Sequence, residues 1–170
     1  AFKKMLQERF DMVKQKTVKY EYQAPDQEWV KLAEKQFSDL ETSVETKVSQ
    51  EFLDKVIKAI TYIPENFHPI SKASRVLKDR AKKYEEGVAD WALGELFAYG
   101  TLLLENTNVR LSGQDVIRGT FSHRHSQIFD ETTNEAYCGL NHIQKDQSEF
   151  MVYNSLLSEY AVLGFEYGYS

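Results

Sequence analysis

Hydrophobic residues recur at intervals of three and four positions through much of the chain, the spacing that places them on one face of a helix. Ser49 and Asp90 stand directly before two of these periodic stretches and are favourable N-cap residues. Gly87 follows a third stretch, where a helix-ending glycine belongs. The pattern therefore predicts helices close to residues 1–21, 29–33, 50–60, 73–84 and 91–105.

Shorter apolar runs after residue 105 predict β-strands. They lie at residues 109–111, 137–140 and 150–153, and the first leads into a Ser112-Gly113 loop. A helix followed by a strand, a glycine-containing loop, further strands and another helix is the order of a parallel α/β sheet. We therefore expect an α/β fold with ligands at the carboxyl ends of its strands, which puts residues 112–115 at the ligand edge.

The last stretch, residues 154–168, predicts a helix with apolar residues on every side, so it should be mostly buried. Glu159 lies within it and would then need a donor, a cation or a raised pKa. The alternative is that Glu159 and Glu166, about two helical turns apart, share a narrow strip that faces water.

Length and composition are those of one globular domain with a core, since 42% of the 170 residues are hydrophobic. The net charge of −5 argues against a nucleic-acid-binding surface, which is usually basic. No apolar run approaches the ~20 residues of a membrane-spanning helix, and no signal-peptide pattern opens the chain. Because both ends interrupt or follow helical patterns without a capping signal, we expect a fragment of a longer polypeptide.

Cys138 is the only cysteine, which excludes an intramolecular disulfide and is typical of a reducing compartment. Its short β-like surroundings favour a small buried thiol over a nucleophile. The pair His123 and His125 is a weak metal signal, because no cysteine or carboxylate stands nearby at the spacing of a zinc site. We therefore predict no metal site in this chain.

Three ordered motifs, at residues 109–125, 139–143 and 154–168, carry a resemblance to a known family. The chain resembles the E1 components of 2-oxoglutarate dehydrogenases, which are thiamine diphosphate enzymes. The resemblance covers residues 90–170 and extends more loosely over residues 29–87. It implies a helical linker over residues 1–87, followed at residues 88–170 by the truncated N-terminal part of a transketolase-like pyrimidine-binding domain.

The resemblance assigns a role to Glu159. In the family, a carboxyl group hydrogen-bonds the N1′ atom of the cofactor's pyrimidine and thereby generates the 4-imino base that deprotonates the thiazolium. The family places this carboxylate nine positions before a glycine that ends the helix, and counting back from Gly168 reaches Glu159. Glu166 is the competing carboxylate.

The resemblance also implies that residues 118–125 face the thiazolium and the substrate. His125 is then the stronger candidate for a contact with the substrate or a decarboxylation intermediate, and His123 the weaker one. Asn141 and His142 are expected to have supporting roles, and Arg118 to pair with Asp115 or to orient the loop. The alternative for both loop histidines is a surface or locally bonded position.

The implied parent enzyme is the tricarboxylic acid cycle E1 subunit that decarboxylates 2-oxoglutarate and transfers the succinyl group to the lipoyl group of the E2 succinyltransferase. It works as a homodimer, in the bacterial cytoplasm or the mitochondrial matrix, without nucleic acid or membrane. Its Mg²⁺ site, a Gly-Asp-Gly motif with a downstream asparagine, is absent here, so the fragment alone should be inactive. The alternatives are an E1 for a related acid such as 2-oxoadipate, or a non-catalytic helical interaction module.

Overall fold

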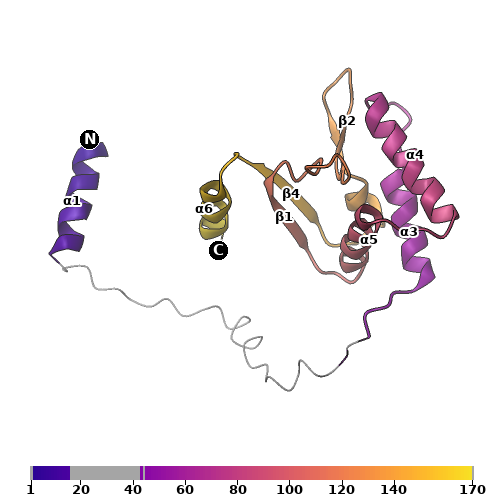
Figure 1. The fold of residues 1–170 in the computed structure, drawn as a ribbon, viewed down its shortest axis with the longest axis horizontal. Helices are drawn as coiled ribbons and strands as arrows, with labels where there is room; N and C mark the ends of the chain where they lie inside the picture. Colours follow the sequence, from indigo (N-terminus) through magenta and orange to yellow (C-terminus); the bar gives the residue numbers. More distant parts are fainter. Residues whose placement is uncertain (1, 16–42, 44, 170) are drawn as a thin grey trace. The chain divides into compact units, whose positions relative to one another are not determined.

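The computed structural model describes residues 2–15, 43 and 45–169, which fall into two units, Ala1–Thr46 and Lys47–Ser170 (Figure 1). In the first unit, helix α1 spans Phe2–Lys14 and has no buried residue. The short helix predicted at residues 29–33 lies outside the described residues. None of the helices in the described ranges has the length and apolar composition needed to cross a membrane.

In the second unit, three helices precede the strands. Helix α3 covers Gln50–Thr61, α4 covers Ser71–Glu85 and α5 covers Trp91–Leu104. The predicted caps are confirmed, because the side chains of Ser49 and Asp90 accept hydrogen bonds from Phe52 N (3.4 Å) and Leu93 N (2.8 Å). The local sequence thus defines where both helices begin.

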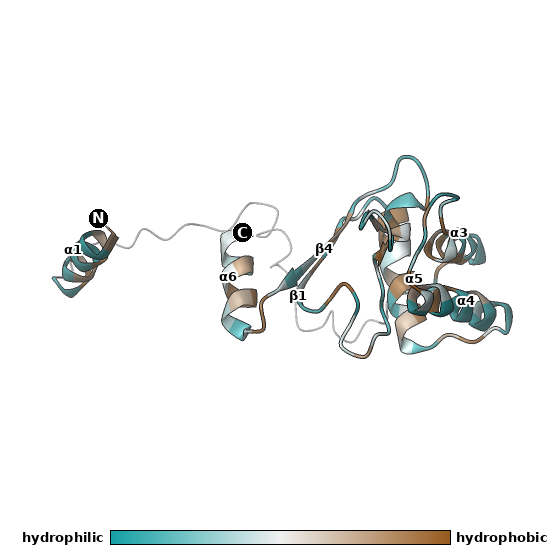
Figure 2. Ribbon diagram, turned by 90° about the horizontal axis from the view of Figure 1, so that it is seen from above, coloured by the Kyte–Doolittle hydropathy of each residue, from teal (hydrophilic) through white to brown (hydrophobic). Residues whose placement is uncertain are grey.

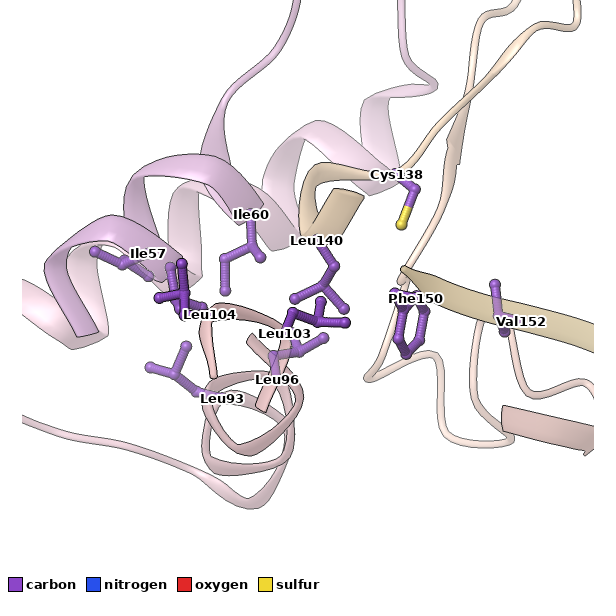
Figure 3. Close-up of a cluster of buried hydrophobic side chains, with 11 residues drawn as sticks. Ile57, Ile60, Leu93, Leu96, Leu103, Leu104, Cys138, Leu140, Phe150 and Val152 are labelled. Carbon is purple, nitrogen blue, oxygen red and sulfur yellow. The ribbon is translucent and has the colours of Figure 1, made fainter. Parts of the chain in front are cut away.

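The hydrophobic core of the second unit lies between α3, α5 and the strand segments (Figure 3). It comprises Val56, Ile57, Ile60, Leu93, Leu96, Leu103, Leu104, Cys138, Leu140, Phe150 and Val152. Burial of Cys138 raises the pKa of its thiol, which confirms the prediction of a small buried side chain. Because α3 and α5 share this core with the strands, the compact unit starts at Lys47; the boundary expected near residue 87 stays a prediction.

The predicted parallel pairing is confirmed. Strand β1, Val109–Gln114, runs parallel to β4, Phe150–Ser155, in a register that pairs Val109 with Phe150 and Gln114 with Ser155. Both strands continue beyond the predicted ends, because this pairing satisfies the backbone hydrogen-bonding groups through the Ser112-Gly113 segment. Residues 154 and 155, which were expected to begin the last helix, belong to β4, and helix α6 covers Glu159–Tyr169.

The strand predicted at residues 137–140 is wrong in part. Strand β3 covers only Ala136–Tyr137 and pairs antiparallel with β2, Ile128–Phe129. A short 3₁₀ helix, η2, then covers Gly139–His142 and packs against α3. The apolar run 137–140 thus begins in a strand and ends in a helical turn. A run of four residues is too short for its periodicity to distinguish a strand from a helix.

Asp130 holds the turn between β2 and β3. Its carboxylate accepts hydrogen bonds from the backbone N–H groups of Thr132 (2.7 Å), Thr133 (2.9 Å) and His68. These donors, led by His68 and Thr133, lower the pKa of Asp130 to about 2. A buried carboxylate thus ties the turn to the segment between α3 and α4.

We expect the chain to lose stability as the pH falls from about 5 to about 2. The folded-state pKa of Asp130 lies below its unfolded value of about 3.9, so its contribution is present above that value and disappears as the group is protonated in the folded state. Asp130→Asn should flatten this dependence in thermal unfolding measured from pH 7 to 3. Glu166 adds a second contribution of the same sign, so the slope should diminish without vanishing. An unchanged slope in the variant would contradict the prediction.

Candidate functional site

The parallel pairing of β1 and β4 brings the predicted site segments to one edge (Figure 1). The loop of residues 115–126 leaves the carboxyl end of β1, and the segment that enters α6 leaves the carboxyl end of β4. Asn154 links the two, because its Oδ1 accepts a hydrogen bond from Ile117 N (3.0 Å). The histidine loop and the start of the Glu159 helix therefore both emerge from this edge.

The loop of residues 115–126 is held by its own backbone. The N–H groups of Arg124 and His125 both donate to the carbonyl of Arg118, at 2.9 and 3.0 Å. Ser122 and His125 adopt positive φ angles of 53° and 37°, which reverse the chain on both sides of the turn. The loop therefore has a defined conformation that presents its side chains in different directions.

Long-range side-chain contacts fix the same loop. Arg124 forms a two-pronged pair with Glu95 of α5, with Nε–Oε1 and Nη2–Oε2 distances of 2.5 and 2.9 Å. Arg80 of α4 donates to the carbonyls of His123 (3.2 Å) and Arg124. Arg118 pairs with Asp115, as predicted.

His125 points into the protein. It is 9% exposed, and with Arg80 and Ser126 it lines a cavity of about 10 Å³, which is too small for a substrate. Burial, and next the positive charge of Arg80, lower the pKa of its imidazole, so it is neutral at pH 7. Its Nε2 has no hydrogen-bond partner within the described part of the chain.

His123 points elsewhere. Its half-buried ring lies over Gly119 and beside Phe121, and it lines an open groove of about 670 Å³ at the start of α5. Trp91, which is 96% exposed, lines the same groove. Of the two histidines, His123 is thus the one beside an open groove, whereas the resemblance favours His125 for a contact with the substrate.

The two carboxylates of α6, Glu159 and Glu166, differ in their hydrogen-bond partners. Glu166 receives two hydrogen bonds of 2.8 Å from the guanidinium of Arg110 and one of 2.6 Å from Ser112 Oγ. The Arg110 and Ser112 donors lower the pKa of Glu166 to about 2. Glu166 therefore anchors α6 to β1.

Glu159 is the first residue of α6, and its side chain is exposed. No hydrogen bond or ion pair joins this side chain to another described residue. It stands in the first turn of a helix, where an anionic group is favoured by the exposed N–H groups. Among the described residues its carboxylate is therefore an open hydrogen-bond acceptor.

The expectation of a mostly buried final helix is wrong for this chain. No residue of α6 is buried, and its hydrophobic side chains are largely exposed, including Tyr160 at 85% and Tyr167 at 89%. Figure 2 shows hydrophobic positions in brown along this helix. The reason is geometric: among the described elements α6 packs mainly against β1 and β4, and a sheet of two strands covers one side of a helix at most.

Asn141 and His142 lie away from the ligand edge. Asn141 Oδ1 accepts from Phe150 N (2.7 Å) at the start of β4, and His142 stacks on Tyr137 with ring centroids 4.9 Å apart. They hold η2 in place. Among the residues described, no group of three or more His, Cys, Asp or Glu side chains is arranged to hold a metal ion.

Comparisons with known proteins assign the sequence of this part of the chain to a class. Residues 88–170 match the family model described as "Transketolase, pyrimidine binding domain", a domain of thiamine diphosphate-dependent enzymes. The fold with its parallel sheet is consistent with that class. The strands, the histidine loop and α6 all lie within the matched range.

Relatives identify the family more narrowly. The chain is 43% identical over 146 residues to the 2-oxoglutarate dehydrogenase E1 component of Brucella anthropi, covering 85% of the chain and 15% of the relative. It is 44% and 47% identical over 126 residues to the mitochondrial 2-oxoglutarate dehydrogenases of Saccharomyces cerevisiae and Caenorhabditis elegans, covering 74% of the chain and 12% of each relative. The chain belongs to the family of 2-oxoglutarate dehydrogenase E1 components and spans about an eighth of their length.

Proposed function

We propose that this chain forms the pyrimidine side of the thiamine diphosphate site in an E1 component that oxidatively decarboxylates 2-oxoglutarate. The observation that carries the proposal is the contrast between the two carboxylates of α6. Glu166 is committed to Arg110, whereas Glu159 has no partner within the described residues and stands four residues after the end of β4. An exposed carboxylate beside an apolar, aromatic helix face fits a heterocycle with a ring nitrogen.

Glu159 would share a hydrogen bond with the pyrimidine N1′ of the cofactor. When bound, the cofactor supplies the electron sink for decarboxylation. The chain's own contribution is to hold a proton at the Glu159 carboxyl group and to shield the site with the exposed side chains of α6. Arg110 keeps α6 fixed on β1, so the carboxylate stays at the strand edge.

The two histidines would serve the substrate in different ways. His123 lines the open groove, from which it would contact a dicarboxylic oxo acid. His125, neutral and buried, reaches substrate only if the loop shifts, and otherwise supports the loop from within. The two contacts have different requirements: His123 is reached from the open groove, whereas His125 is reached only after the loop shifts.

The rest of the assembly is proposed by analogy with the relatives. Mg²⁺ would bind the cofactor's diphosphate through residues outside this chain, and a homodimer would complete the site. The succinyl group would pass to the lipoyl group of an E2 partner. The relatives include bacterial and mitochondrial proteins, so the proposed compartments are the bacterial cytoplasm and the mitochondrial matrix. An E1 for 2-oxoadipate is the alternative substrate assignment.

The test compares the isolated chain with the enzyme that contains it. We expect the enzyme to decarboxylate 2-oxoglutarate only with thiamine diphosphate and Mg²⁺, with a higher kcat/KM than for 2-oxoadipate, and the 170-residue chain to show no turnover. The measurement is carbon dioxide release together with reduction of an artificial electron acceptor. A preference for 2-oxoadipate would reassign the substrate, and decarboxylation by the isolated chain would refute the idea that it forms only one side of the site.

A further inference from the structure

Arg80 is a charged side chain in the interior of the second unit. It lies on α4, is 5% exposed, and has no carboxylate within ion-pair distance in the described ranges. Burial lowers the pKa of its guanidinium to about 10, opposed by the more distant charge of Asp90, so the group is still charged at neutral pH. A buried charge of this kind is costly unless it makes strong hydrogen bonds.

The partners of Arg80 are two consecutive backbone carbonyls. Its Nη2 donates to the carbonyl oxygens of His123, at 3.2 Å, and of Arg124. These carbonyls lie between Ser122 and His125, whose positive φ angles turn the chain away from any strand ladder. The guanidinium therefore replaces the hydrogen bonds that a neighbouring strand would give.

The turn that Arg80 holds carries both loop histidines, and its geometry separates them. His123 faces the open groove beside Trp91, and His125 faces the small cavity that Arg80 itself lines. Rotation of the 123–124 and 124–125 peptides, which carry these two carbonyls, would break the hydrogen bonds to the guanidinium and move the backbone from which the two rings project. The direction of each ring is thus linked to the two hydrogen bonds.

We propose that Arg80 is a positioning residue for the proposed active site, which it serves from α4 by holding the His123-Arg124 turn. The proposal rests on the function proposed above and adds a residue that precedes the stretch matching the pyrimidine-binding family, which begins at residue 88. Helix α4 is then part of the machinery of the site. A purely packing role for Arg80 is the alternative that the test must separate.

The test uses three variants of the 170-residue chain and of the enzyme that contains it. Arg80→Met removes the charge and both hydrogen bonds while keeping an unbranched side chain, and Arg80→Lys keeps the charge but not the planar fork. Lys83→Met is the matched control, since Lys83 is on the same helix but binds Asp79 and Asp90 instead of the loop. The first readout is amide hydrogen exchange of Arg124 and His125, whose N–H groups both bind Arg118 O.

We expect Arg80→Met to accelerate exchange at these two amides by about tenfold or more beyond the change in the α5 amides. Arg80→Lys should restore part of the protection, and Lys83→Met should leave the loop amides in step with α5. In the enzyme, Arg80→Met should lower kcat/KM for the oxo acid by about tenfold while the affinity for thiamine diphosphate stays within about twofold.

Equal acceleration in the loop and in α5 would mean that Arg80 only stabilises the fold, and the proposal would fail. Loop acceleration without a change in kcat/KM would also overturn it, because the turn would then not serve the site. The exchange result does not depend on catalysis. Failure of the proposed function, seen as full turnover without Glu159, is thus distinguishable from failure of this inference.

Discussion

Glu159→Gln should lower the turnover of 2-oxoglutarate by about a hundredfold or more in the enzyme that contains this chain. Glutamine keeps the size of the side chain but has no ionisable proton to share with a ring nitrogen, and losses of proton-transfer groups typically cost 10²- to 10⁴-fold. Because Glu159 is exposed and has no partner among the described residues, the fold should be unaffected. The measurements are kcat at saturating thiamine diphosphate and the thermal unfolding curve.

Glu166→Gln is the matched comparison on the same helix. Its carboxylate holds Arg110 and Ser112, so loss of its charge should lower the unfolding temperature. The amide oxygen of glutamine can still accept a hydrogen bond from Arg110, so below the transition α6 should stay on β1 and most of the turnover should remain. The two variants are thus expected to show opposite signatures, one in catalysis and one in stability. If Glu159→Gln keeps near-normal turnover, or if Glu166→Gln alone abolishes it in a folded enzyme, the assignment of the carboxyl group is lost.

The sequence identified features that depend on neighbouring residues. Ser49 and Asp90 are caps because each side chain meets an N–H group three residues ahead. The parallel sheet was also predictable, since the order of its elements leaves few alternatives. The resemblance to the E1 family is confirmed by the comparisons. It was also visible in the sequence, because contiguous motifs carry it.

Features that depend on distant partners were not predictable. Glu159 and Glu166 look alike along the helix, and the difference comes from Arg110, which is 56 residues away from Glu166. The directions of the two histidines are linked to Arg80 and to Glu95, which lie 43 and 29 residues away from their loop contacts. The exposure of α6 likewise depends on the width of a sheet, which periodicity along one helix does not report.

The motif glycine Gly139 illustrates the same limit and leads to the second large effect. The sequence treats residues 139–143 as a family motif, but in the structure Gly139 begins η2 where it touches the backbone of α3. A Cβ atom at this position would lie 2.5 Å from Ala59 O and 3.0 Å from Ile60 Cα. These are backbone atoms in a helix, so no side-chain rotation relieves the clash.

Gly139→Ala should therefore destabilise the chain by about 2 to 3 kcal/mol, the upper range for overpacking, because η2 and α3 must move apart. Urea unfolding followed by circular dichroism measures the change. Gly94→Ala is the control, since Gly94 lies inside α5 with nothing within 4 Å of the added methyl group, and it should be neutral or stabilising by up to about 1 kcal/mol.

A variant at Gly100 distinguishes a clash with side-chain atoms from the clash with backbone atoms expected at Gly139. A Cβ there would lie 2.6 Å from both γ-methyl groups of Val56, so Gly100→Ala should also destabilise, but Val56→Ala should rescue part of the loss in the double variant. The clash at Gly139 is with backbone atoms and should not be rescued by shortening any single side chain. If Gly139→Ala unfolds at the same urea concentration as Gly94→Ala, then η2 does not rest on α3 in solution. The seating of Leu140 in the core, which follows from that contact, would be wrong as well.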